Sequence, residues 1–387
     1  MKTVRLGIIG LGNIGRFHAK TVMAGKVARC ELKAVASRSP DARDEFPTLP
    51  FFQEPEALMR SGLVDAVLVA TPHWQHPQIG MQAFAAGLHV MSEKPIAAHK
   101  ADAERFIAAH QRHPELVFGG MFQFRAESHY QAMRQWLRNG SLGELVRVSW
   151  INTDWFRPDA YYASSEWRAT WEGEGGGVLV NQCLHNLDML QWLAGMPASV
   201  QGFCQLGRFH DIEVEDDVTA YLEWANGATG TFISSTGEVP GTNRLEISGT
   251  RGRLLWENGR LLATSNAVET TVLCRTTADA FAKPQAMTTE LSFVPVESAH
   301  AILLQNFVNA ILGSEPLLAP GAEGIHSIEL ANAILFSSLE RQAVNLPLDG
   351  AAWESRLHEL IRVSPKRART IRSVPGDVAG SFRSQAR

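Results

Sequence analysis

The 387-residue chain is predicted to be an α/β protein of two domains, a doubly wound parallel sheet followed by an α+β domain with a largely antiparallel sheet. Two patterns predict this division. Roughly the first 120 residues alternate short apolar runs with longer amphipathic stretches, which is typical of βαβ units. From Val200 to Val294, short β-type runs follow one another and are separated by turn signals such as Asn226-Gly227.

The N-terminal domain is expected to alternate strands and helices. The strands are predicted at Val4–Ile9, Leu32–Ala36, Asp65–Ala70, Leu88–Met91 and Leu116–Gly119, and the helices at Ile14–Ala24, Pro55–Gly62, Pro77–Ala86 and Lys100–His113. Such units cross over right-handedly and place ligands at the carboxyl ends of the strands. We therefore expect a ligand site at that edge of the sheet.

The pattern changes after about residue 145. A strand is predicted at Val146–Ile151, an irregular aromatic stretch at Asp154–Trp171, and a helix from the Gly-rich segment Gly173–Gly177 to about Leu193. Further strands are expected at Val218–Trp224, Thr229–Ser235, Arg244–Ile247 and Leu254–Trp256, and helices near Ala299–Leu312 and Gly324–Gln342. We place the domains at 1–123 and 124–350.

Residues 365–387 differ from both domains. They contain six basic residues and one acidic residue, so we expect a solvated, partly disordered tail, with a nucleic-acid-binding or partner-binding arm as the alternative.

Composition excludes several classes of protein. The net charge of −4 argues against nucleic-acid or membrane-surface binding, no apolar run reaches the about 18 residues of a membrane span, and no signal peptide is recognisable. The four cysteines form no CxxC pair, so we expect reduced thiols in a cytoplasmic protein and no metal site. The acidic run Glu213, Glu215, Asp216 and Asp217 has only His210 beside it and is expected to be a solvated start of a strand.

The segment Gly10-Leu11-Gly12-Asn13-Ile14-Gly15 predicts a dinucleotide site, because it follows an apolar strand and precedes a helix. Gly10 would make the tight turn and Gly12 would let the backbone approach a pyrophosphate at the helix N-terminus, while Gly15 would allow close helix–strand packing. We therefore expect a Rossmann domain that binds NAD or NADP, with Asn13 and Ile14 also at the cofactor.

The end of the second strand bears on the choice of cofactor. No Asp or Glu follows it directly to accept from a ribose 2′-hydroxyl, whereas Ser37 and Arg38 would suit a 2′-phosphate. On this ground the sequence favours NADP over NAD. The alternative is that Arg38 stacks on the adenine or lies in solvent.

The next two strand ends supply further candidates. Thr71, Pro72, His73 and His76 follow the third strand, and Glu93-Lys94-Pro95 follows the fourth. Beside an oxidised nicotinamide the pKa of Lys94 should fall, which suits it to polarise a substrate hydroxyl or share its proton. The alternative is a surface lysine in a loop. These residues, together with Gln123, complete the predicted cofactor set.

A polar stripe is predicted on the helix after the Gly-rich segment, where Asn181, His185 and Asp188 are spaced to share one face. A histidine there would be a natural general base for a hydroxyl proton, although a buried core histidine with Asn181 as a cap is an equal alternative. Aromatic and arginine side chains upstream either bind sugar or belong to a core or interface. With Lys94, Arg125, Asn181 and His185, the predicted substrate set contains Trp155, Arg157, Tyr161, Tyr162, Trp167 and Arg168.

Gly10–Gly15, the Glu93-Lys94-Pro95 triplet and the Gly-rich segment with His185 together resemble the Gfo/Idh/MocA oxidoreductase family over roughly residues 3 to 345. The resemblance implies a Rossmann domain and a C-terminal domain with a large open sheet, often used to build homodimers or homotetramers. It also implies that Lys94 and His185 match the family's catalytic lysine and histidine. The stretch 181–188 looks like the branch acting on pyranosides and anhydrosugars, such as levoglucosan dehydrogenase.

One residue departs from the family pattern. The family usually carries Asp four residues before the histidine, and this chain has Asn181, whose amide can orient a hydroxyl but cannot relay a proton. We expect a dehydrogenase that moves hydride between NAD(P) and a secondary alcohol of a sugar, glycoside or polyol. The alternatives are an NAD-dependent glycosidase on the same fold and a non-catalytic NAD(P)-binding regulator.

Overall fold

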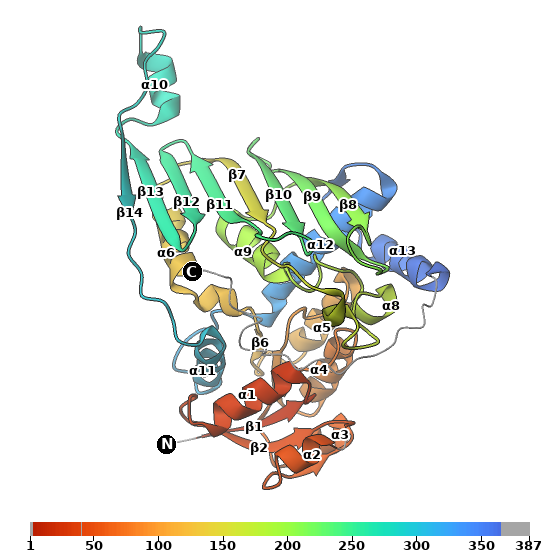
Figure 1. Ribbon diagram of the computed structural model, residues 1–387. Helices are drawn as coiled ribbons and strands as arrows, with labels where there is room; N and C mark the ends of the chain where they lie inside the picture. The colour runs from red at the N-terminus through yellow and green to blue at the C-terminus, as the bar shows by residue number, and fades with distance from the viewer. Residues whose placement is uncertain (1–2, 40, 365–387) are drawn as a thin grey trace.

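The computed structural model describes residues 3–39 and 41–364, and the predicted tail at 365–387 lies outside them. Two sheets dominate the described chain, a smaller parallel sheet built by the N-terminal residues and a larger one built by the C-terminal residues (Figure 1). The predicted fold class is therefore confirmed. None of the described helices is long and apolar enough to cross a bilayer.

The first sheet has six strands in the order β3-β2-β1-β4-β5-β6, all parallel. Its central strands are largely apolar and buried on both faces, as expected for parallel strands covered by helices. The order reverses between β1 and β4, which opens a crevice at the carboxyl ends of these two strands. The strands are β1 (Val4–Ile9), β2 (Cys30–Ala36), β3 (Phe51–Phe52), β4 (Ala66–Val69), β5 (His89–Ser92) and β6 (Phe118–Gly120).

Five helices connect these strands, and four were predicted to within a few residues. The short α2 and β3 escaped prediction because each is too short to show a hydrophobic period. The helices are α1 (Asn13–Met23), α2 (Asp41–Glu45), α3 (Pro55–Met59), α4 (Gln75–Ala85) and α5 (Lys100–Gln111).

The second sheet has nine strands in the order β14-β13-β12-β11-β7-β10-β9-β8-β15. Its neighbours pair antiparallel except β7 and β10, which are parallel. The strands are β7 (Leu145–Asn152), β8 (Ser199–Leu206), β9 (Glu215–Glu223), β10 (Thr229–Ser235), β11 (Asn243–Gly249), β12 (Gly252–Glu257), β13 (Arg260–Asn266), β14 (Ala286–Glu290) and β15 (Val344–Asn345).

Helices α6, α9 and α12 lie on the face of this sheet that is turned toward the N-terminal domain, and α10 projects beyond the sheet edge (Figure 1). Helix α12 contacts both β8 and α5, so it joins the two domains. The elements are η1 (Gln123–Ala126), α6 (Ser128–Arg138), α7 (Asp159–Tyr162), α8 (Trp171–Glu174), α9 (Leu184–Ala194), α10 (Thr270–Thr276), α11 (Ala299–Ile311), η2 (Gly321–Glu323), α12 (Gly324–Glu340) and α13 (Gly350–Val363).

The helix predicted from the Gly-rich segment to Leu193 is wrong in its first half, since α9 begins only at Leu184. Glu215 on β9 explains the difference. Its carboxylate accepts the N–H groups of Gly177 (2.8 Å) and Leu179 (3.0 Å), and its backbone carbonyl accepts that of Val178 (3.0 Å). The chain therefore follows the start of β9 in turns, and Asn181 precedes the helix that carries His185.

The acidic run at 213–217 lies at the start of a strand, as expected, but the expectation that it is solvated is wrong for Glu215 and Asp216, which are fully buried. Asp216 accepts the N–H groups of Arg208 (2.8 Å) and Phe209 (2.8 Å) and lies 2.9 Å from Nδ1 of His210. Burial of these carboxylates is tolerated because N–H donors surround them.

Candidate functional site

The N-terminus of α1 forms a cradle whose dimensions depend on three glycines. Gly10 has φ +94°, and a Cβ on Gly15 would lie 1.9 Å from the Gly10 carbonyl oxygen, so both positions require glycine. A Cβ on Gly12 would meet nothing within 4 Å, and no side chain caps the helix there. Across the crevice, Thr71 Oγ1 is buried without a hydrogen-bond partner. Free helix N–H groups beside open space and an unpartnered hydroxyl fit a dinucleotide pyrophosphate.

The end of β2 carries the two residues assigned to cofactor choice. Ser37 Oγ accepts from the backbone N–H of Ser39 at 3.2 Å, and Arg38 is exposed. The side chain of Arg38 is thus open to a ligand at the strand's carboxyl end.

Lys94 follows β5 and reaches across to the C-terminal domain, where its Nζ donates to the backbone carbonyl of Asn181 at 2.8 Å. Burial lowers the pKa of Lys94 to about 8, against the raising effect of the negative charges of Glu93 and Glu174. His73, after β4, is buried in the same region with Nδ1 3.4 Å from the Glu174 carbonyl oxygen. Two strand ends of the first domain therefore meet the segment 174–181 of the second.

Two of the predicted cofactor residues hold loops in place. Glu93 is buried, lies 2.7 Å from His18 Nε2, and accepts the backbone N–H of Lys94 at 3.1 Å. Burial would raise the pKa of Glu93, but His18 lowers it overall. His76 places its ring nitrogens 2.7 Å from the Pro95 carbonyl oxygen and 2.6 Å from that of Thr71. Both side chains fix the loops that carry Thr71 and Lys94.

His185, in the first turn of α9, is only 2% exposed. Its Nε2 lies 3.0 Å from the Gln123 amide nitrogen, while its Nδ1 is buried without a partner. Burial first, and then the positive charge of Lys94, holds the pKa of His185 well below its ordinary value. The imidazole is therefore neutral at neutral pH and has one ring nitrogen left for a ligand.

The irregular stretch before α9 converges on the hydroxyl of Tyr161. This oxygen accepts from Arg168 (2.7 Å), from the side-chain amide of Gln182 (3.1 Å) and from that of Asn181 (3.4 Å). The Arg168 guanidinium stacks 4.4 Å over the Tyr161 ring, and Trp167 packs edge-on against His73. The structure thus brings Tyr161, Trp167, Arg168 and Asn181 to the Lys94 site.

Other members of the predicted substrate set face elsewhere. Arg125 is fully buried in ion pairs with Asp188 (2.7 Å) and Glu323, which leaves it occupied by carboxylates. The Tyr162 hydroxyl donates to Thr236 at 2.8 Å, and Trp155 Nε1 donates to Asn152 at 2.7 Å. These contacts stabilise the loop that carries Tyr161.

Arg157 lies between the residues at the Lys94 site and the predicted substrate residues that face elsewhere. Its guanidinium is 5.1 Å from the centre of the Tyr161 ring, and its Nε is buried without a partner. The side chain therefore keeps a donor available close to Tyr161.

Sequence reasoning missed Glu174 and His300, which act on Lys94 or are acted on by it from α8 and α11, and His18 of α1, which contacts Glu93 and His300. Glu174 carried one signal, a carboxylate directly before three glycines and the apolar run that follows them. The two histidines carried none, because their neighbours are brought near only by tertiary packing.

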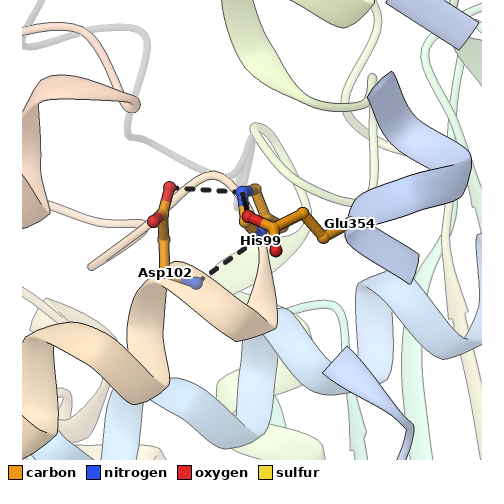
Figure 2. Close-up of side chains that lie close together, drawn as sticks. All are labelled: His99, Asp102 and Glu354. Carbon is orange, nitrogen blue, oxygen red and sulfur yellow. Dashed lines mark hydrogen bonds and ion pairs between the residues drawn. The ribbon is translucent and has the colours of Figure 1, made fainter. Parts of the chain in front are cut away.

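One group among the described residues has metal-ligand types, namely His99, Asp102 and Glu354 (Figure 2). His99 Nε2 lies 3.2 Å from Asp102 Oδ2, and its Nδ1 accepts the Asp102 backbone N–H as the cap of α5. Arg105 bonds both carboxylates, at 2.6 Å to Asp102 and 2.5 Å to Glu354. The guanidinium supplies the positive charge that a cation would bring, so the group is a structural ion-pair network.

Comparison with known families gives two matches. The model of the oxidoreductase family with an NAD-binding Rossmann fold matches residues 4–121, and that of the GFO/IDH/MocA C-terminal domain matches residues 130–255. Together they span most of the chain.

Among curated proteins, the chain is similar to inositol 2-dehydrogenase of Rhizobium meliloti (strain 1021), with 26% identity over 89% of this chain and 99% of that protein. It is also 26% identical to 1,5-anhydro-D-fructose reductase of Ensifer adhaerens over 75% of this chain and 82% of that protein.

Among solved structures, the WlbA dehydrogenase from Bordetella pertussis in complex with NADH and UDP-GlcNAcA has a TM-score of 0.74 and 25% identity over 90% of this chain and 100% of that one. Levoglucosan dehydrogenase with NADH and levoglucosan shares the fold, with a TM-score of 0.73 and 20% identity over 90% of this chain and 100% of that one.

Proposed function

Because the chain belongs to the Gfo/Idh/MocA family of NAD-binding oxidoreductases, we propose that it moves hydride between NAD(P) and a secondary alcohol of a sugar, glycoside or polyol at Lys94 and His185. The observation that carries the assignment is the contact of Lys94 Nζ with the Asn181 carbonyl, four residues before His185. This contact connects the crevice of the first domain to the segment of the second domain that leads into the helix carrying His185.

Lys94 is proposed to bind and acidify the substrate hydroxyl. An ammonium has three N–H donors, and the Asn181 carbonyl takes only one of them. The lowered pKa of Lys94, about 8, makes its proton easier to share at neutral pH. When bound, the nicotinamide accepts or returns the hydride.

His185 is proposed to accept the hydroxyl proton at Nδ1, the ring atom without a partner. A base at Nδ1 requires a hydrogen on Nε2, so the Gln123 amide is proposed to turn its oxygen toward Nε2 in place of its nitrogen, which lies 3.0 Å away, and to accept that hydrogen in both protonation states of the ring. The neutral histidine set by burial is the form that a general base requires.

The sugar is proposed to bind to five side chains, those of Arg157, Tyr161, Trp167, Arg168 and Asn181. Aromatic faces and planar donors suit the C–H faces and hydroxyls of a ring substrate. Inositol dehydrogenase and anhydrofructose reductase among the relatives support a cyclic polyol or sugar.

The cofactor preference for NADP is proposed from Ser37 and the exposed Arg38. NADH is the cofactor in the structures of both neighbours described above. Comparison of kcat/KM for NAD⁺ and NADP⁺ tests the preference, and Arg38→Ala should lower only the NADP⁺ value if the guanidinium meets the 2′-phosphate. Equal losses with both cofactors would remove this assignment.

We further propose a homodimer or homotetramer built through the open face of the large sheet. Helices cover one face only (Figure 1), and on the other face Phe203 is 58% and Tyr221 38% exposed. Location in the cytoplasm stays a prediction from the cysteine pattern.

The activity is tested by a cofactor-reduction screen over sugars, glycosides and polyols with the wild type and Lys94→Ala. We expect net NADH or NADPH with a ring substrate, and a loss of about 10²- to 10⁴-fold in turnover for the variant while cofactor binding persists. Cleavage of a glycoside without net reduced cofactor would indicate the glycosidase. Tight cofactor binding with neither reaction would indicate the regulator, and near-normal turnover in Lys94→Ala would remove Lys94 from the mechanism.

A further inference from the structure

We propose that Glu174 is the positioning residue of the substrate site: it fixes the Asn181 amide so that the amide oxygen faces the substrate, and it supplies the negative charge that position 181 lacks. The inference rests on the proposed function and names a group that acts through Asn181. Glu174 lies in α8 and is 2% exposed.

Both carboxylate oxygens of Glu174 accept hydrogen bonds. Oε1 accepts from Asn181 Nδ2, and Oε2 accepts from the backbone N–H of Ala169 at 2.5 Å. A protonated carboxyl group would have to place its own hydrogen against one of these donors, so the geometry favours the ionised form. Burial raises the pKa of Glu174, while Arg168, the two donors and Lys94 oppose that rise.

This pairing fixes the orientation of the Asn181 amide. A carboxylate accepts only from the NH₂ end, so Asn181 must turn Nδ2 toward Glu174 and Oδ1 away from it. Within the described chain no group donates to Oδ1, and Oδ1 is not among the buried polar atoms that lack a partner, so it retains solvent access. Asn181 therefore presents a hydrogen-bond acceptor next to Lys94.

The same hydrogen bonds leave the neighbouring Tyr161 hydroxyl as a donor, whereas Asn181 presents an acceptor. Its hydroxyl oxygen already accepts from Arg168, Gln182 and Asn181, which exceeds the two lone pairs of a hydroxyl. The hydroxyl hydrogen of Tyr161 has no acceptor in the part of the chain that the structure describes. A ligand with vicinal hydroxyls would thus meet an acceptor at Asn181 and a donor at Tyr161.

Glu174 also acts on Lys94 through its charge. Glu93 and Glu174 are the carboxylates that raise the pKa of Lys94, while Arg168 and Arg157 lower it. The buried histidines beside Lys94, His73 and His185, have pKa values well below their ordinary range and add no positive charge at neutral pH. Loss of the Glu174 charge should lower the pKa of Lys94 further below about 8.

An exchange of the carboxylate and the amide tests the inference. In Glu174→Gln the new amide bonds the Ala169 N–H through its oxygen, so its NH₂ faces Asn181 and turns that amide over. We expect kcat/KM to fall by about 10- to 100-fold, because the substrate loses its acceptor. Glu174→Gln/Asn181→Asp restores one amide and one carboxylate in exchanged places, and we expect recovery to within about tenfold of the wild type.

Two controls separate positioning from a general structural defect. Glu172→Gln makes the same chemical change on the exposed side of α8 and should leave kcat/KM and the pH profile unchanged. The pH dependence of Lys94 acylation, followed by mass spectrometry in the enzyme without substrate, reports the pKa of Lys94 directly. It should shift to lower pH in Glu174→Gln and return in the double variant.

Each outcome decides the matter. The inference is overturned if the double variant neither recovers activity nor restores the Lys94 labelling profile. It is also overturned if neither Glu174→Gln nor the double variant folds. If Glu174→Gln alone does not fold but the double variant does, the pairing is supported. A wild type that oxidises no sugar or polyol, yet shows the labelling shift and its reversal, contradicts the proposed function and leaves the Glu174–Asn181 pairing intact.

Discussion

His185 and Gln123 illustrate how single contacts set the chemistry at the residue scale. The histidine is neutral because burial disfavours its charged form, and the neighbouring amide is itself uncharged. A change in the charge at position 123 should therefore be transmitted directly to the ring.

We predict that Gln123→Glu raises the pKa of His185, because a carboxylate 3.0 Å from Nε2 would stabilise the imidazolium. The acidic limb of the kcat/KM profile for alcohol oxidation should move to higher pH, since the base must be neutral to act. Gln123→Ala removes the amide without adding charge and should lower the rate with no such shift. An unmoved acidic limb in Gln123→Glu would show that His185 is not the base.

A second prediction at this scale concerns Lys94. Its pKa is lowered to about 8, chiefly by burial, so its protonated form is lost as the pH rises through that value. If protonated Lys94 acidifies the substrate hydroxyl, kcat/KM for oxidation should decline above about pH 8. Activity that keeps rising well above that pH would indicate that neutral Lys94 is the active form. Lys94→Arg serves as the comparison, because a guanidinium stays protonated across this range.

At the scale of elements, the glycines at the start of α1 have different roles, one in helix packing and one at the ligand site. A Cβ at position 15 would lie 1.9 Å from a backbone oxygen, whereas one at position 12 would meet nothing within 4 Å. Gly15 is thus required by packing, whereas the absence of a side chain at Gly12 leaves space for a ligand.

We predict that Gly12→Ala folds with a thermal midpoint close to that of the wild type but binds the dinucleotide at least about tenfold more weakly, because its methyl group fills the space at the helix N-terminus. Gly15→Ala should instead lose the native fold or much of its stability. Thermal unfolding and cofactor titration of both variants check this contrast. Unchanged cofactor affinity in Gly12→Ala would place the pyrophosphate elsewhere.

The elements that sequence predicts well are those with a clear period. The apolar runs of β1 and β4 and the amphipathic α1 were predicted nearly to the residue, because burial on both faces leaves little room for polar residues. The segment 177–183 was predicted as helix because its apolar spacing fits one. It is not helical because Glu215, far away in sequence, takes its N–H groups.

The candidate site shows the same division. Lys94 and His185 were predicted from motifs, each lying beside a recognisable strand end or Gly-rich segment. Glu174 was missed as a site residue because its role depends on where Asn181 turns its amide, and that orientation follows from tertiary packing alone. Arg125 was assigned to substrate because its charge is visible in the sequence while its buried partners are not.

At the scale of the whole molecule, Arg125 links three separate parts of the chain. It lies in η1, just after the first domain, and binds Asp188 of α9 and Glu323 of η2. Because Arg125 is fully buried, removal of Asp188 would leave its charge with Glu323, whose side chain is 44% exposed, in place of a buried carboxylate.

We predict that Asp188→Ala lowers the free energy of unfolding by about 3–5 kcal/mol, the cost typical of an orphaned buried ion. Urea denaturation measures the effect. Arg5→Ala, which breaks the exposed pair with Asp65, should change the stability far less. A small loss in Asp188→Ala would mean that water or Glu323 compensates the guanidinium.

The open face of the nine-stranded sheet bears on how copies of the molecule associate. Along β9, Val218, Ala220 and Leu222 are buried beneath the helices, while Thr219 and Tyr221 point to the uncovered face. Ile233 of β10 lies on that face, in register with Thr219 on one side and Ile151 on the other. The centre of the face therefore carries two adjacent apolar side chains, Ile151 and Ile233, bordered by Thr219 of β9 and Arg244 of β11.

We predict that Ile233→Arg dissociates the proposed oligomer, because an oligomer symmetric about this face would bury the same charge from each copy without a partner. The molar mass from light scattering should fall to that of one chain, 42.5 kDa, while the circular dichroism spectrum stays that of the wild type. Met23→Arg, at a position 53% exposed on α1, makes the same change away from the sheet and should leave the mass unchanged. A mass that does not change in Ile233→Arg, or a wild type already monomeric, would show that the open face does not join copies of this chain.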